Sequence, residues 1–277
     1  MWDEINKKQN EDDMIQLLFY SRSLYNNSTR ITILKIIVVI INIILSLMQK
    51  DTVYLSAAFF IIFTILEISE HFCIKNAAKA RNLFDNNLFE LGSKDYEIEI
   101  KEKAYSLCKR HKKSYGIQKV NLGTDNPPGL RNWYSEKEGN NKNEIVFKCQ
   151  IENTKWDKKI TKIDLIIFIA VLIAVAVLVI FKYYNKELSE LISVIMAGVE
   201  LVYEIIKRFV VYSVYNINIS NRECLINQFS KNKIKKDDLI SLQYLIEKRR
   251  EMDLVPLNFI HKKITNYMHD LINRVNK

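Results

Sequence analysis

Acidic side chains recur within an apolar stretch of this sequence, residues 188–206, at a spacing that places them on one side of a helix. They and two small residues follow steps of three, four, three and four: Glu190, Ser193, Ala197, Glu200 and Glu204. Because residues three and four apart are neighbours on a helix surface, these five form one stripe. A carboxylate that faces hydrocarbon is strongly unfavourable, so the stripe requires water, a cation or a proton beside it.

Two interpretations of this stripe stay open on spacing alone. In the first, a water-filled path is lined by four of its members: Ser193, Ala197, Glu200 and Glu204. In the second, the carboxylates are structural, and they make contacts between helices or at the membrane interface. Lys207 and Arg208 follow directly in the chain and are suitable partners for Glu204 in an interfacial ion pair.

Two further apolar stretches carry polar residues on one face, and a third carries none. In the first stretch, residues 31–48 and the residue that follows, one helix face carries Lys35, Asn42, Ser46 and Gln49. In the second, residues 53–69 and the two that follow, one face carries Ser56, Thr64, Glu67 and His71. Residues 165–181 are seventeen consecutive apolar side chains. This contrast predicts a water-accessible interior between three helices and a fourth helix that faces lipid.

Catalytic motifs are absent from the sequence. It contains no GxGxxG, GxxxxGK[ST], GxSxG or HExxH pattern. His71 lies two residues from Cys73, but no second such pair completes a set of four metal ligands. The four cysteines are scattered without a CxxC motif, which is typical of reduced cytoplasmic thiols. We therefore expect no catalytic residues, no metal site and no cofactor.

The four apolar stretches are long enough to cross a membrane. The average composition, 26% charged and 48% hydrophobic, would suit a soluble protein, but charge and apolarity are segregated along the chain. At about 1.5 Å per residue, seventeen apolar residues nearly cross a hydrocarbon core of about 30 Å. Only residues 49–52 and 182–187 separate the members of each pair, so neighbouring helices must be antiparallel. The predicted fold is an all-α membrane protein with four transmembrane helices in two hairpins and a mostly helical cytoplasmic domain.

The distribution of positive charge predicts the topology. Of 41 Lys and Arg residues, the short turns hold only Lys50, Lys182 and Lys186. Cytoplasmic segments carry an excess of Lys and Arg, so both termini and the middle of the chain are expected in the cytoplasm, and the polar start of the chain gives no sign of a signal peptide. The expected division is an amphipathic N-terminal helix at 1–30, hairpins at 31–70 and 164–206, a middle domain at 71–163, and C-terminal helices at 207–277.

Helical patterns extend into the cytoplasmic segments. We expect helices over residues 77–91, 97–115, 236–250 and 257–275, and a turn-rich patch over residues 116–139. Residues 144–151 fit either a short strand or the start of the helix that leads into the third span.

Several short motifs occur in a fixed order relative to the spans. Gln9–Asn10 and an R-x-L-Y pattern from Arg22 precede the first span, and an A-A…F-D-x-x-L-F pattern from Ala77 to Phe89 follows the second. An N-W-Y pattern spans Asn132 to Tyr134. A C-Q-x-x-N-x-x-W-D pattern from Cys149 to Asp157 precedes the third span, and a Q-x-x-I-x-x-x-R…V-P pattern begins at Gln243. With this order of motifs, nearly the whole chain resembles the SMODS-associated four-transmembrane pore-forming effectors of bacterial conflict systems, although Asn26 and Asn27 depart from that family's pattern.

The resemblance implies a function in anti-phage defence. Such effectors are associated with nucleotidyltransferases that make cyclic oligonucleotide messengers, and they are thought to permeabilise the inner membrane of the infected cell. An anionic messenger with stackable bases requires Arg or Lys beside aromatic faces. The candidate ligand-binding residues are Arg131, Trp133, Tyr134, Lys148, Gln150, Asn153 and Trp156. The alternative is that Trp133 and Trp156 are packing anchors. Asp157 is expected to cap a helix or to pair with a nearby cation.

Two function classes follow from these observations. The first is a ligand-gated, homo-oligomeric pore in the bacterial inner membrane, and the second is a membrane-anchored scaffold that recruits a soluble partner and conducts nothing. The expected partners of the pore are the lipid bilayer and a cyclic oligonucleotide, with no DNA. The missing motifs disfavour an enzyme. Polar stripes in three of four spans favour the pore, because an anchor needs no carboxylates within the membrane.

Overall fold

The computed structural model describes residues 1–47, 53–183 and 199–252 of the chain. In this part the regular elements are all helices: α1 (Trp2–Gln9), α2 (Asp12–Leu47), α3 (Val53–Phe89), α4 (Glu97–Arg110), α5 (Lys112–Val120), α6 (Lys142–Tyr183), α8 (Val199–Phe229) and α9 (Lys236–Arg250). The described part contains no strand, only an isolated bridge between Leu122 and Arg131. The prediction of an all-helical protein is confirmed.

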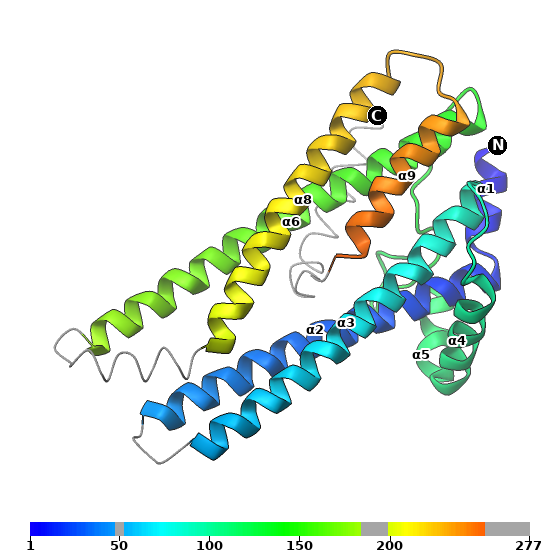
Figure 1. Ribbon diagram of the computed structural model, residues 1–277. Coiled ribbons are helices and arrows are strands. Elements are labelled where there is room, and N and C mark those ends of the chain that lie inside the picture. The colour runs from blue at the N-terminus through cyan, green and yellow to red at the C-terminus, as the bar shows by residue number, and fades with distance from the viewer. Residues whose placement is uncertain (48–52, 184–198, 253–277) are drawn as a thin grey trace.

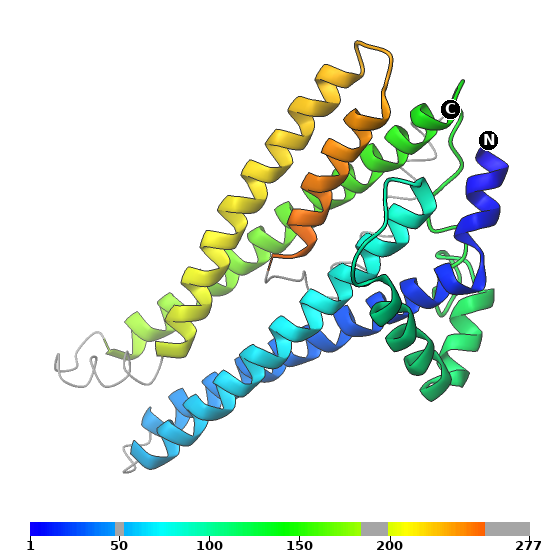
Figure 2. The same cartoon turned by 45° about the vertical axis from the view of Figure 1, so that its right-hand side comes forward.

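Four long helices dominate the structure (Figure 1). α2 and α3 run antiparallel and pack side by side, and α6 and α8 do the same (Figures 1 and 2). α9 returns along α6 and α8 and also contacts α3, whereas α4 and α5 lie against the start of α2. The short helices therefore gather at the end of the bundle that holds the N-terminus.

Two described helices are long and apolar enough to cross a membrane. They are Asp12–Asn42, with a mean hydropathy of 1.3, and Ala57–Phe89, with a mean hydropathy of 1.8. α6 continues through the apolar residues 165–181, and α8 begins at Val199. The arrangement of four spans stays a prediction, because residues 48–52 and 184–198 lie outside the described part.

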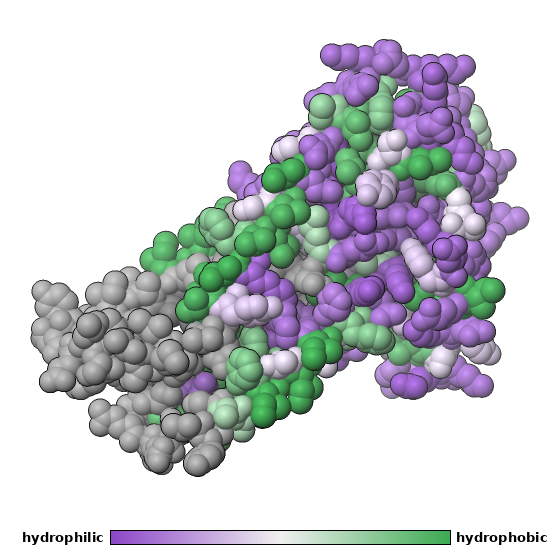
Figure 3. Space-filling model, in the orientation of Figure 1, coloured by the Kyte–Doolittle hydropathy of each residue, from purple (hydrophilic) through white to green (hydrophobic). Residues whose placement is uncertain are grey.

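Hydrophilic residues cover one end of the described surface, and apolar residues appear along the long helices away from that end (Figure 3). Large apolar side chains on the middle of α3 face outward: Phe60, Ile61, Ile65, Ile68 and Phe72 are each more than half exposed. α2 shows the same pattern, with Ile33, Leu34, Ile37 and Ile40 exposed. A contiguous apolar surface of this kind needs to be covered, and a lipid bilayer covers it for a membrane protein. Hydrophilic residues predominate at the other end (Figure 3), where α1, α4 and α5 lie in the same orientation of Figure 1.

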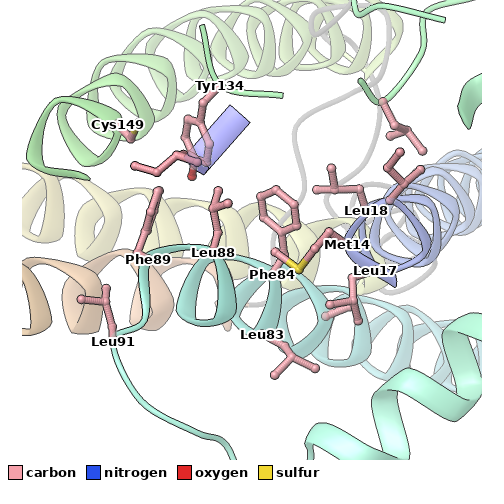
Figure 4. Close-up of a cluster of buried hydrophobic side chains, with 14 of the residues drawn as sticks. Met14, Leu17, Leu18, Leu83, Phe84, Leu88, Phe89, Leu91, Tyr134 and Cys149 are labelled. Atoms are coloured by element: carbon pink, nitrogen blue, oxygen red, sulfur yellow. The ribbon is translucent and has the colours of Figure 1, made fainter. Parts of the chain in front are cut away.

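A hydrophobic core lies at the polar end (Figure 4). Met14, Leu17 and Leu18 of α2 pack with Leu83, Phe84 and Leu88 of α3, and Tyr134 and Cys149 close the core from the other side. Burial raises the pKa of the Cys149 thiol well above its usual range, so this side chain stays protonated. The predicted cytoplasmic segments thus form a compact core around the ends of α2 and α3.

The structure decides several local alternatives. Residues 144–151 are helical, as the first turns of α6. The helix predicted over residues 97–115 is divided at His111 into α4 and α5. α5 continues to Val120, so the turn-rich segment starts later than predicted, because Gly116 is accommodated inside a helix. The predicted helix at 236–250 is confirmed as α9, and that at 257–275 lies outside the described residues.

Four long helices extend beyond the predicted spans. The expected domain boundaries at residues 30, 70, 163 and 206 fall inside α2, α3, α6 and α8 respectively. Each helix therefore runs without interruption from the polar half into the apolar half.

The close approach of Gly129 to the backbone of Asn121 can be tested by substitution. A Cβ at residue 129 would lie 1.7 Å from the backbone oxygen of Asn121, whereas a Cβ at Gly116 would meet nothing within 4 Å. We predict that Gly129→Ala lowers the midpoint of thermal unfolding in detergent, because one backbone segment must shift. The control Gly116→Ala should be neutral or stabilising by up to about 1 kcal/mol, because alanine favours a helix. Equal midpoints for the two variants would contradict the close approach at Gly129.

Candidate functional site

A lysine without exposed surface joins three helices. The ammonium of Lys35 on α2 lies 2.5 Å from Glu67 Oε2 on α3 and 2.9 Å from Glu204 Oε1 on α8, and it also pairs with Glu70. We call these four residues the Lys35 cluster. The i, i+3 spacing of Glu67 and Glu70 places both carboxylates on the face of α3 that meets α2. The cluster therefore links the first pair of long helices to the second.

Further polar groups surround the Lys35 cluster. Glu67 also pairs with Lys207, and the Thr32 hydroxyl donates to Glu70. The Arg208 guanidinium lies 4.0 Å from Glu204 Oε1. Three carboxylates thus face three cations, which offsets much of the penalty for taking each charge out of water. Removing one partner would leave an uncompensated buried charge.

The carboxylates of the Lys35 cluster have the spacing of a cation site. Oxygen atoms of Glu67, Glu70 and Glu204 all lie within 4.8 Å of one another. The Lys35 ammonium lies among them, so a protein cation takes the position that a divalent ion would need. The arrangement joins α2, α3 and α8 through ion pairs.

The structure places one of the predicted pore-lining residues. Glu204 is buried, 8% exposed, and is held between Lys35 and Arg208. Its geometry corresponds to the ion-pair interpretation, with Lys35 as a partner that the sequence analysis had not assigned to it. Ser193 and Ala197 lie outside the described residues, and Glu200 lies on α8 with its side chain outside the description. Pore lining by these residues stays a prediction.

A second group of buried charges lies at the polar end, centred on Asp85 of α3. Arg250 of α9 lies 2.7 Å from Asp85 Oδ2, and Arg81 lies 3.7 Å from Oδ1. The Tyr134 hydroxyl donates to Asp85 Oδ1 at 2.8 Å and accepts a hydrogen bond from Asn153 at 2.7 Å. Burial and the adjacent carboxylate raise the pKa of Tyr134 well above its usual range, so the phenol acts as a neutral donor.

Asp157 of α6 forms a third group. Its Oδ2 lies 2.9 Å from Arg222 of α8, and its Oδ1 lies 2.7 Å from Arg249 of α9. Burial alone would raise the pKa of Asp157, but Arg249 and Arg222 lower it below its ordinary value. The expectation that Asp157 pairs with a cation is confirmed. One carboxylate thus joins three helices.

The motifs that carry the family resemblance converge on Tyr134. Gln9 accepts from the Tyr134 backbone N–H at 3.0 Å, and the Asn10 and Asn132 side chains are hydrogen-bonded at 2.8 Å. Arg22 donates to the carbonyl oxygens of Pro128 and Gly129, at 2.9 Å each. These contacts pin the loop between α5 and α6 to the start of α2. The N-W-Y segment is therefore held in one position relative to the helix bundle.

The structure brings together only part of the predicted ligand-binding set. Trp133, Tyr134 and Asn153 lie together, and the Arg81 guanidinium lies 4.2 Å from the centroid of the Trp133 ring. Arg131 and Lys148 are exposed, and Lys148 donates to the Glu138 carbonyl at 2.6 Å.

The remaining two candidates, Gln150 and Trp156, also lie on α6. Gln150 is buried and donates to the Leu239 carbonyl of α9 at 2.9 Å. Trp156 is partly buried. The sequence did not identify four arginines as partners of Asp85 and Asp157: Arg81, Arg222, Arg249 and Arg250. Arg249 and Arg250 do lie within the motif that begins at Gln243.

A family model described as the SMODS-associating 4TM effector domain matches residues 3–269. No curated protein and no solved structure matches the chain.

The Asp157 group generates a prediction on stability. Asp157→Asn leaves two buried guanidinium groups without their shared carboxylate, which should destabilise the protein by about 3–5 kcal/mol. The measurement is unfolding of the purified protein in detergent. The matched control is Glu223→Gln, because Glu223 forms an exposed pair with Lys158 at 2.6 Å, and exposed pairs contribute at most about 1 kcal/mol. If both variants unfold like the parent, Asp157 does not hold the three helices together.

Proposed function

Because the chain belongs to the SMODS-associating 4TM effector family, a family of membrane effectors in SMODS-associated anti-phage systems, we propose that it forms a pore in the bacterial inner membrane. A cyclic oligonucleotide messenger opens the pore, and the loss of membrane integrity halts the infected cell. The effector has no enzymatic activity. Both termini and the segment between the two pairs of long helices lie in the cytoplasm, where the messenger is made.

The Lys35 cluster is the observation that carries this proposal. It places a lysine and three glutamates between helices whose outward faces are apolar. A well-packed apolar residue at such a position is often as stabilising as a buried ion pair, or more so, so an anchor gains nothing from this arrangement. A switch does gain, because ion pairs give the helices a defined closed packing that another set of partners can replace. A ligand that binds better to the open packing shifts the equilibrium towards it.

Opening changes what the carboxylates face. In the closed packing Glu67, Glu70 and Glu204 are neutralised by the cations beside them. Separation of α8 from α2 and α3 removes the contact of Glu204 with Lys35, and the acids then need water or permeant cations. Four helices from one chain leave little lumen, so the conducting form is a homo-oligomer with the same face of each subunit towards a common axis. The open pore should therefore prefer cations.

Leakage of a trapped dye tests the proposal directly. Liposomes that contain the purified protein should retain the dye until one member of a panel of cyclic oligonucleotides is added. A non-conducting scaffold is the competing function, and it predicts retention with every member of the panel. Retention with the complete panel, for protein shown to be inserted and folded, would reject the pore.

Lys35→Met should open the pore without a messenger. The variant leaves three neighbouring carboxylates, two of them buried, without the ammonium that joins them, so the closed packing loses its central contact. We expect spontaneous leakage and toxicity on expression, with the protein still inserted in the membrane. Lys162→Gln is the matched control, because Lys162 is exposed on α6. A Lys35→Met variant that is inserted and folded but stays closed and still responds to the messenger would show that the Lys35 cluster is only structural.

A further inference from the structure

Buried positive charge exceeds buried negative charge where α3, α6, α8 and α9 meet. Two aspartates, Asp85 and Asp157, face four arginines: Arg81, Arg222, Arg249 and Arg250. The neighbouring pairs Lys94–Glu247 and Lys137–Glu152 are balanced and contribute no spare acid. Among the described residues, two positive charges in this region thus lack a carboxylate. Burial of unpaired charge is unfavourable, so the region favours an anion with two negative charges.

Arginine donors in this region also lack acceptors. Arg222 has no exposed surface, and its Nε and one terminal nitrogen have no hydrogen-bond partner among the described residues. The same holds for the Nε of Arg249 and one terminal nitrogen of Arg81. A buried donor without an acceptor is unfavourable, because it has lost its hydrogen bonds to water. Oxygen atoms of a bound anion would satisfy these donors, and guanidinium groups match the geometry of phosphate.

Aromatic rings accompany the arginines. The Arg249 guanidinium lies 5.3 Å from the centroid of the Tyr215 ring, and Arg81 lies 4.2 Å from that of Trp133. Tyr215 is buried and Trp133 is only partly buried, so of these two rings Trp133 is the one with exposed surface on which a nucleobase can stack. The region therefore combines the two features that a nucleotide requires, and it does so with residues that the sequence had not assigned to ligand binding, apart from Trp133.

From this geometry we infer that Arg81, Arg222, Arg249 and Arg250 form a receptor for two phosphodiester groups of a cyclic oligonucleotide. The inference rests on the proposed function and assigns the site of the messenger. The anion occupies the guanidinium nitrogens that Asp85 and Asp157 leave without an acceptor, and by sharing these arginines it weakens their pairs with the two aspartates. Since these aspartates join α3 to α9 and α6 to α8 and α9, weaker pairs loosen the contact between the two pairs of long helices.

A substitution of arginine by lysine tests whether the donors without acceptors bind the anion. Arg222→Lys keeps the positive charge beside Asp157 but removes the donors that lack acceptors. The full chain is placed in phosphatidylcholine nanodiscs, and the affinity for a panel of cyclic dinucleotides and trinucleotides is measured by calorimetry. We expect the variant to bind at least tenfold more weakly than the parent. The control Arg110→Lys, at an exposed position of α4, should bind as the parent does.

Stability and lipid composition are controlled in the same experiment. The thermal midpoint without ligand shows whether Arg222→Lys is folded; if it is not, Arg81→Lys takes its place, with the same expected loss. Phosphatidylglycerol carries the same phosphodiester group, so a second set of nanodiscs contains this lipid. If the parent binds the anionic lipid at the cluster and no nucleotide, the assignment to a cyclic oligonucleotide is overturned.

The remaining outcomes separate the inference from the proposed function. A parent that binds a nucleotide, together with folded Lys variants that bind it equally well, overturns the receptor site and leaves the gated pore intact. A parent that binds no member of the panel overturns both. Loss of binding in the variants, with leakage that is abolished for the same nucleotide, supports both.

Discussion

The charge of Lys35 determines how the long helices pack. A fully buried ammonium is tolerated only where carboxylates surround it, and here the carboxylates come from α3 and α8. The two pairs of long helices therefore meet at a defined register, because a shift of one turn would move Glu204 away from Lys35. Apolar contacts alone do not impose such a register, since one aliphatic side chain replaces another easily. The position of α8, and of every element that packs on it, follows from this contact.

At the polar end, buried carboxylates are surrounded by cations, which is the reverse of the arrangement around Lys35. There the carboxylates are few and the guanidinium groups are many, so Asp85 and Asp157 each hold two arginines. Uninterrupted helices connect these groups to the Lys35 cluster. In the proposed mechanism, the contacts of the two charged groups break together when the long helices separate. Binding of an anion at one group can therefore bias the packing at the other without any flexible linker between them.

Much of the fold could be predicted from local patterns in the sequence. The apolar run at residues 165–181 and the stripes with Lys35 and Glu67 indicate long helices with polar interior faces, and the described residues are helical there. The partners of these charges could not be predicted, because Lys35 and Glu204 are 169 residues apart. Helical spacing shows which residues share a face, but it does not show which face of another helix lies opposite. The arginine cluster was missed for the same reason: Arg81, Arg222 and Arg249 are separated in the sequence, and three helices bring them together in the fold.

In the proposed mechanism, the buried ion pairs hold the two pairs of long helices closed, and the messenger separates them. The most direct measurement is the distance between spin labels at Lys75 of α3 and Ser213 of α8, both exposed. Cys73 and Cys224 are first replaced by Ser, and Cys108 and Cys149 are buried. Pulsed electron paramagnetic resonance should give one distance without ligand and a second, longer distance in nanodiscs that contain the messenger. A distance distribution that stays unchanged under conditions that cause dye leakage would contradict this mechanism.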